Sequence, residues 1–386
     1  MGFISQALWN LRTKPGAWGL DVEGHADIVA GEGRPRAGVR LWGRQCALTL
    51  RAGKDKRHKI KQTGAKKWEW ELKNPGILTI EEARELRFPD GSIFAPEFGL
   101  TVATLALDRR PAEPFVDFDL DLPAGVQLAY QPAVTPAERD GNGVIGPATR
   151  PAWAVGSFGA FLGGAKLGHI PRPFAVDADG NWTWGAAEVL NLGGQLVYRK
   201  TFPAAWLAAA RLPLVVDASM GYTTAGGTTS TFAANYVGLA GGYAGVGSAT
   251  SVSMYCFKNP AAQVTLGIYN AAKSLQRDTA GGSTPTAAAW VTLNLDSAAA
   301  LAEGVVYWLA WNWDGTSTYY YDVVDQHDNT YIASTYVHGT LPAGPLGTMS
   351  YSSVNGQKIS IYATYTPTAA GGGLLVHPGM AGGMRG

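Results

Sequence analysis

The sequence predicts an all-β protein with two β-sandwich or jelly-roll units, an N-terminal helical arm and a Gly-rich C-terminal tail. Three observations lead to this prediction. The 386 residues include 50 Gly, 22 Pro and 16 Tyr but only 16% charged residues, a mixture typical of short strands joined by many turns. Several segments alternate apolar and polar residues with a period of two. Residues 202–222 (FPAAWLAAARLPLVVDASMGY) separate two such β-rich regions.

Residues 1–20 are expected to form the arm, because apolar side chains there recur at helical spacing until Pro15 and Gly16 end the pattern. This helix would either dock on its own domain or insert into a neighbouring protein.

Residues 21–222 are expected to form a β-rich anchoring or assembly domain. Residues 116–122 (VDFDLDL) and 68–72 (WEWEL) alternate as half-buried antiparallel strands do. Residues 80–87 (IEEARELR) predict a short helix or turn. Residues 133–170, which are rich in Gly, Pro and Ala, predict a long surface loop, with a capping box and one helical turn at residues 135–138 (TPAE).

Residues 202–222 predict a helical turn followed by a buried strand that closes the first unit. Residues 223–367 then predict a second sandwich, because seven apolar segments are separated by loops at regular spacing. Residues 368–386 are rich in Gly and Ala and are expected to be a tail that orders on a partner. The seven predicted strands are 251–258, 263–269, 289–295, 305–313, 318–324, 330–334 and 357–365.

Charge and motif content argue against several functions. The formal net charge of +1 gives no overall attraction to nucleic acid or to an anionic membrane. The basic run at residues 54–67 contains no interleaved aromatic residue, so we expect a solvated loop and no nucleic-acid partner. No apolar run of about 18 residues and no signal-peptide pattern is present. The two cysteines lie far apart, and the six histidines form no HxH or HExxH motif, so we expect neither a metal site nor another cofactor.

The turn at residues 177–181 (DADGN) resembles the start of a calcium-binding loop. An EF-hand loop needs Gly at its sixth position and a bidentate acid at its twelfth. Glu188 occupies the twelfth position, but Trp182 occupies the sixth. We therefore expect a plain Asx/Gly turn here.

The strongest candidate for a binding site is an aromatic group around residues 307–321. Trp311 and Trp313 share one face of a predicted strand, and Trp308 lies on the other. One face must be core, and the other could display rings that stack on sugars, while nearby Asp side chains bind hydroxyl groups. The simpler interpretation makes all of these aromatics core and subunit interface. The candidate glycan ligands are Trp308, Trp311, Trp313, Tyr320, Asp322 and Asp325.

Two groups of segments resemble a known family. Residues 66–76 (KKWEWELKNPG) and 118–138 (FDLDLPAGVQLAYQPAVTPAE) form the first group, and residues 154–161, 168–184 and 202–223 form the second. In this order they resemble a family of uncharacterised structural proteins of tailed phages over roughly residues 60–224. The chain departs from that pattern at Ile170-Pro171, at residues 212–214 and at residues 218–220. Residues 223–367 are similar to the carbohydrate-binding sandwiches of virion and bacterial surface proteins.

The resemblance implies a non-enzymatic virion protein, assembled in the host cytoplasm. It would be a capsid decoration protein, a head fibre or a tail appendage, and it would form a homo-oligomer, most plausibly a homotrimer. Its partners would be capsid, portal or tail proteins and, in host attachment, a surface glycan. No catalytic residue is implied. The alternative is a tailspike-type polysaccharide-degrading enzyme, which needs two carboxylates facing one cleft. A third possibility, a secreted bacterial sugar-binding module, is disfavoured by the lack of a signal-peptide pattern.

Overall fold

The computed structural model shows an all-β protein, as the sequence predicts. The arm at 1–20, the tail at 368–386 and Asp325 lie outside the described residues. The structure describes residues 36–41, 44–50, 59–64, 67–72, 76–97, 100–122, 124–162, 165–217, 220–221, 225–243, 247–302, 305–324, 330–346, 351–352 and 356–367.

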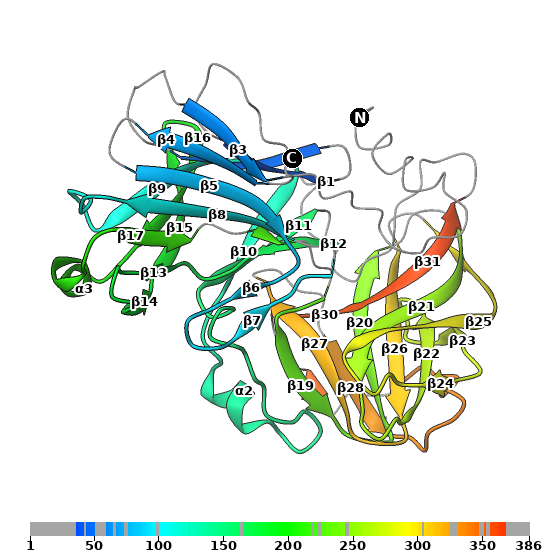
Figure 1. Cartoon of the computed structure of the whole chain (residues 1–386). Helices are drawn as coiled ribbons and strands as arrows, with labels where there is room; N and C mark the ends of the chain where they lie inside the picture. The colour runs from blue at the N-terminus through cyan, green and yellow to red at the C-terminus, as the bar shows by residue number, and fades with distance from the viewer. Residues whose placement is uncertain are drawn as a thin grey trace.

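The first unit consists of two antiparallel sheets that face each other across an apolar core (Figure 1). The smaller sheet has the strand order β1 (Arg36–Leu41), β2 (Arg44–Leu50), β9 (Phe115–Asp121), β16 (Gln195–Thr201) and β15 (Ala186–Leu192). Along the larger sheet run β10 (Val126–Gln131), β11 (Ser157–Leu162), β12 (Ala165–Ile170), β18 (Met220–Gly221), β8 (Leu100–Leu107), β17 (Leu214–Asp217), β13 (Phe174–Val176) and β14 (Trp182–Trp184). Strand β5 (Gly76–Ala83) also pairs with β8, and β4 (Lys67–Leu72) and β3 (Lys59–Gly64) follow it outward.

The alternation in β9 places its side chains as the sequence predicts. Phe118 and Leu120 are 1% exposed and belong to the same apolar core as Leu214 and Val216 of β17. Helix α3 (Ala204–Ala209) and β17 confirm the predicted helical turn and buried strand.

The second unit is also a sandwich of two antiparallel sheets. The six-stranded sheet has the order β19 (Thr228–Phe232), β27 (Ser317–Val323), β21 (Gly247–Phe257) and β25 (Ala289–Leu301), with β30 (Gln357–Ile359) on β27 and β31 (Ile361–Pro367) on β21. The facing sheet has the order β23 (Leu275–Asp278), β22 (Gln263–Tyr269), β26 (Val306–Trp313), β20 (Tyr236–Tyr243), β28 (Thr330–Thr335) and β29 (Tyr351–Ser352), with β24 (Gly282–Ser283) on β22. All seven predicted segments are strands, but β19 and β20 were missed within a Thr/Gly-rich stretch.

Two predictions about local structure were wrong. Residues 80–87 form β5 and the short strand β6 (Leu86–Arg87), which pairs with β7 (Ile93–Phe94). Pairing of β5 with both β4 and β8 overrides the helical preference of its Glu and Ala residues. Residues 157–162 and 165–170, predicted to belong to a loop, form β11 and β12. The expected capped turn is confirmed as α2 (Pro136–Asp140), with Thr135 and Glu138 forming the capping box.

The chain between β10 and β11 contacts the second sandwich. Val144 and Ile145 pack into the core of that unit, and Ile145 forms a backbone bridge with Phe232. The side chain of Gln131, at the end of β10, exchanges two hydrogen bonds with the backbone of Val323, each 2.9 Å long. Part of the segment predicted as a surface loop therefore joins the two units.

One lysine lies in the core of the first unit. Lys200 is 1% exposed, its amine donates a hydrogen bond to the carbonyl oxygen of Asp217, and it lies 4.8 Å from the centre of the Phe118 ring. Burial disfavours the ammonium and, although Asp217 opposes this, lowers the pKa of Lys200 to about 7.

Replacing Lys200 with methionine should therefore change how stability depends on pH. Between pH 7 and about 9 the unfolded lysine holds a proton that the folded one has released, so the free energy of unfolding rises with pH, by at most about 1.4 kcal/mol per pH unit. We expect this rise in the wild type and not in Lys200→Met, measured by urea unfolding. Burial raises the pKa of Cys256 to about 12, so its thiol lowers the free energy of unfolding as the pH rises. This opposing effect is the same in the wild type and in Lys200→Met. Parallel pH profiles would contradict the prediction.

Candidate functional site

The predicted aromatic ligands divide between the core and the surface. Trp311 and Trp313 are 0% exposed and pack edge-to-face on Phe232, at 5.5 and 5.8 Å between ring centres. Gly238 lies opposite Trp311 on β20, where a Cβ atom would collide with the indole. The proposed position of both tryptophans at a ligand is therefore corrected: they fill the space between the two sheets.

The other face of β26 is also covered. Trp308 is half-buried and packs near Leu341 and Tyr336, and the Lys273 ammonium lies 5.5 Å from its ring centre. Asp322 is 2% exposed and forms an ion pair with Lys166 of the first unit. Asp322 is thus held in a buried ion pair, whereas Trp308 is partly exposed but lies on the opposite face of β26 from Trp311 and Trp313.

Tyr320 belongs to a different set of aromatic side chains, on the outer face of the six-stranded sheet. These five half-buried residues contact one another in a chain, which we call the aromatic row. Ring centres are 6.4 Å apart for Phe257 and Tyr320, 4.9 Å for Tyr320 and Tyr255, 5.3 Å for Tyr255 and Trp290, and 5.0 Å for Trp290 and Tyr362. All but one of these pairs are edge-to-face, the arrangement that aromatic pairs favour.

Strand alternation explains how the row forms. On β21, Met254 and Cys256 point into the core, so Tyr255 and Phe257 point outward. Tyr320 is likewise displayed because its neighbours Tyr319 and Tyr321 are buried. Trp290, Tyr255 and Tyr320 lie on three adjacent strands, about 5 Å apart in the hydrogen-bonding direction. The result is a surface several rings wide.

Polar groups border the aromatic row. The carboxylate of Glu97, in the first unit, accepts hydrogen bonds from the Trp290 indole at 3.3 Å and from the Ala225 amide at 2.8 Å. On the same face, the exposed Thr292 hydroxyl is hydrogen-bonded at 2.8 Å to the hydroxyl of Ser253, which is buried. The Tyr255 hydroxyl donates a hydrogen bond to the Ala288 carbonyl oxygen at 3.3 Å, and burial raises its pKa to about 12.

This combination of rings and hydroxyl groups suits a carbohydrate. Sugar rings carry flat apolar faces that pack on aromatic side chains, and their hydroxyl groups need donors and acceptors nearby. Of the predicted ligands, the row contains only Tyr320. The alternation in residues 251–258 (SVSMYCFK) could have indicated Tyr255 and Phe257. Val252, Met254 and Cys256 predict the core-facing side of this strand, which places Tyr255 and Phe257 on the outer side.

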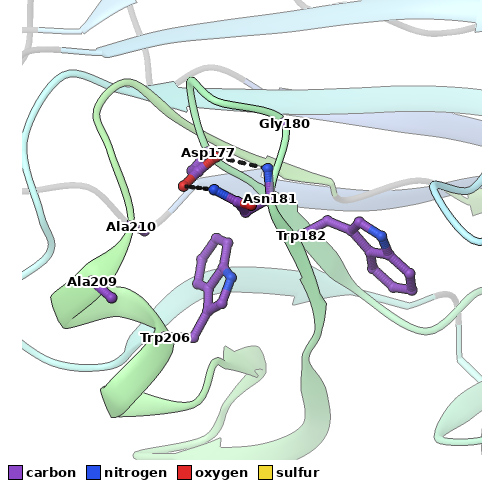
Figure 2. Close-up of a pocket in the computed structure, with 7 residues that line it drawn as sticks. All are labelled: Asp177, Gly180, Asn181, Trp182, Trp206, Ala209 and Ala210. Atoms are coloured by element: carbon purple, nitrogen blue, oxygen red, sulfur yellow. Dashed lines mark hydrogen bonds between the residues drawn. The ribbon is translucent and has the colours of Figure 1, made fainter.

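A pocket with a volume of about 530 Å³ lies in the first unit, beside α3. Figure 2 shows the Trp206 ring rising from α3 toward Asn181, with the Trp182 ring pointing to the opposite side. Asp177 Oδ1 accepts backbone hydrogen bonds from Asp179 and Asn181 at 2.9 and 2.8 Å. Its other oxygen binds the Asn181 side chain at 3.1 Å.

These bonds confirm the predicted Asx/Gly turn. Burial by itself raises the pKa of Asp177, but its hydrogen bonds with Asn181, Arg211 and Asp179 outweigh burial and keep that pKa below its usual value. Because both carboxylate oxygens already accept hydrogen bonds within the turn, we favour the aromatic row as the ligand site. Among the described residues, no group of three His, Cys, Asp or Glu side chains could hold a metal ion. No helix in the described part of the chain is long and apolar enough to span a membrane.

Comparison with known proteins gives no family assignment, since neither a family model nor a curated protein matches this chain. The function must therefore be argued from the site.

Proposed function

We propose that this protein is a structural component of a tailed-phage virion, and that its second sandwich contacts host-surface glycans through the aromatic row. The observation that supports glycan contact is the row itself: five half-buried rings on the outer face of one sheet, bordered by Glu97 and by the exposed hydroxyl group of Thr292. Virion membership rests on the resemblance of residues 60–224 to tailed-phage structural proteins.

In this proposal the first unit anchors the chain to capsid, portal or tail proteins, and copies assemble into a homo-oligomer, most plausibly a trimer. The second unit is turned outward as a capsid decoration, head fibre or tail appendage. Glu97 couples the two roles, because it reaches from the first unit to both Ala225 and Trp290.

Truncating the centre of the row tests glycan contact. Tyr255→Ala and Trp290→Ala should each weaken binding to an array of bacterial surface polysaccharides by about 10-fold or more, because central aromatic contacts typically contribute over 1 kcal/mol. Tyr130→Ala is the matched control, since Tyr130 is a 51% exposed aromatic residue outside the row. Circular dichroism and urea unfolding should show that all three variants remain folded. Undiminished binding by both row variants would rule out the row as the site.

A polysaccharide-degrading activity is the competing outcome, because Glu97 places a carboxylate beside Trp290. Glycosidases use two carboxyl groups, roughly 5 to 9.5 Å apart. If the protein acts by binding alone, host polysaccharide incubated with it gains no reducing ends. Release of reducing ends that Glu97→Gln abolishes would replace the binding proposal with an enzymatic one.

A further inference from the structure

In the part of the chain that the structure describes, an ion pair joins the two units, between Lys166 on β12 and Asp322 on β27. Lys166 Nζ lies 2.7 Å from Asp322 Oδ2, and the two side chains are 3% and 2% exposed. Among the ion pairs of the described residues, it is the one whose two side chains are both most deeply buried. Removing two charges from water costs several kcal/mol per ion, so the pair calls for an explanation beyond stability alone.

A β-bulge brings Lys166 to this position. The register between β11 and β12 shifts at Ala160 and Phe161. As a result Leu167 and Ile170 both reach the core of the first unit, while Lys166 and His169 lie next to the second unit. Asp322 follows Tyr321, which points into the second core, and so faces the first unit.

The pair is held by fixed neighbours. Lys166 Nζ also donates to the carbonyl oxygen of Ala225, at 2.7 Å. Asp322 Oδ1 accepts the backbone N–H of Gly227, at 2.8 Å. This leaves Oδ2 facing the amine, with Oδ1 polarised by an amide in the manner of an oxyanion-binding group.

A buried histidine interacts electrostatically with both members of the pair. His169 is 0% exposed, and its ring borders Gly227, the residue that binds Asp322. Its Nε2 lies 2.6 Å from the Ser157 hydroxyl, and its Nδ1 has no hydrogen-bond partner among the described residues. Burial, together with the charge of Lys166, lowers the pKa of His169 to about 3, so the ring is neutral at pH 7.

Burial alone would raise the pKa of Asp322, but Lys166, His169 and the Gly227 amide lower it further than burial raises it. The resting pair is therefore ionic. A proton must therefore leave the ammonium before the nitrogen can attack, and the low dielectric of the buried site reduces the cost of neutralising the pair.

We propose that Lys166 and Asp322 condense into an isopeptide bond that links the two sandwiches covalently. Nζ attacks Cγ of Asp322, forming the C–N bond. The bond between Cγ and Oδ2 then breaks, and Oδ2 leaves as water with two of the three ammonium protons. His169 relays a proton from nitrogen to the departing oxygen. Oδ1 remains as the amide oxygen on the Gly227 N–H. Ammonium and carboxylate thus give an amide and one water, with no other reactant.

The step is favoured by position. Because the reacting groups are held in contact, no bimolecular encounter is needed, and the entropic part of the barrier falls. A tight site also excludes the water that would hydrolyse the bond. The link would hold the displayed unit on the anchoring unit under mechanical load, and it does not depend on what the aromatic row binds.

Intact mass spectrometry of the purified full-length protein tests the bond. The wild type should be lighter than its sequence by the mass of one water molecule, and protease peptides containing residues 166 and 322 should be recovered joined. Lys166→Arg and Asp322→Ala should show their full sequence masses and migrate more slowly on a denaturing gel, because they lack the closed loop. His169→Gln should lower the cross-linked fraction.

A control pair exists in the same chain. Lys67 and Glu81 form an exposed ion pair at 3.2 Å, with side chains 42% and 38% exposed, and should be recovered in separate peptides. A wild-type protein of full sequence mass, with residues 166 and 322 in separate peptides, overturns the proposal without reference to any variant.

Discussion

Replacing Trp311 with alanine should lower the free energy of unfolding by about 3 to 5 kcal/mol, the usual cost of removing a large aromatic side chain from a packed core. Trp311 is 0% exposed, packs on Phe232 and lies over Gly238, where no other side chain could fill the space left behind. Urea unfolding followed by circular dichroism gives the difference directly.

The matched control for Trp311→Ala is Trp290→Ala, which removes the same side chain from the outer face of the same sandwich. We expect a loss of about 1 kcal/mol or less there, because Trp290 is half-buried and its removal leaves no enclosed cavity. The two variants should also differ in glycan binding. Trp290→Ala should lose binding although it is folded, whereas the folded fraction of Trp311→Ala should still bind. A stable Trp311→Ala protein that no longer binds glycan would show that Trp311 reaches the ligand.

Lowering the pH from 7 to 5 should destabilise the wild type by about 2 kcal/mol through His169 alone. The unfolded histidine takes up a proton near pH 6.5, whereas burial and the positive charges of Lys166 and Arg150 keep the pKa of the folded ring near 3, despite the opposing charge of Asp322. Between these two pKa values the unfolded state binds more protons than the folded state. The free energy of unfolding therefore decreases by about 1.4 kcal/mol for each unit by which the pH is lowered.

His169→Gln separates this effect from other acid effects, since glutamine keeps a polar group that can reach Ser157 but cannot titrate. Urea unfolding at pH 7 and pH 5 should show a smaller loss in the variant than in the wild type. Asp322 does not disturb this window: as a free carboxylate its pKa lies below its usual value, and as the proposed amide it does not titrate. Equal losses in the two proteins would mean that His169 titrates normally in the folded state.

Local pattern was enough to predict most of the strands. In β9 and β22 a regular alternation or a continuous apolar run leaves only one arrangement that buries the apolar side chains, and both strands lie where the sequence places them. Pattern failed at residues 80–87 and at β11 and β12, because their sequences lack a clear apolar alternation and pairing with neighbouring strands decides the conformation. Strand β5 pairs with β4 and β8, and β12 pairs with β11 and, at one residue, with β18.

The sequence by itself determined that the chain is all-β, that residues 202–222 close the first unit, and that an aromatic-rich sandwich follows. Only the tertiary structure decided which aromatic residues are core. Both faces of β26 are covered, one by the facing sheet and the other by residues 336–346, so Trp311 and Trp313 are buried while Tyr255, Trp290 and Tyr320 form the outer row. The contact of Lys166 with Asp322 could not have been predicted either, because alternation gives a residue's face on its own strand but not which strand of another unit will cover that face.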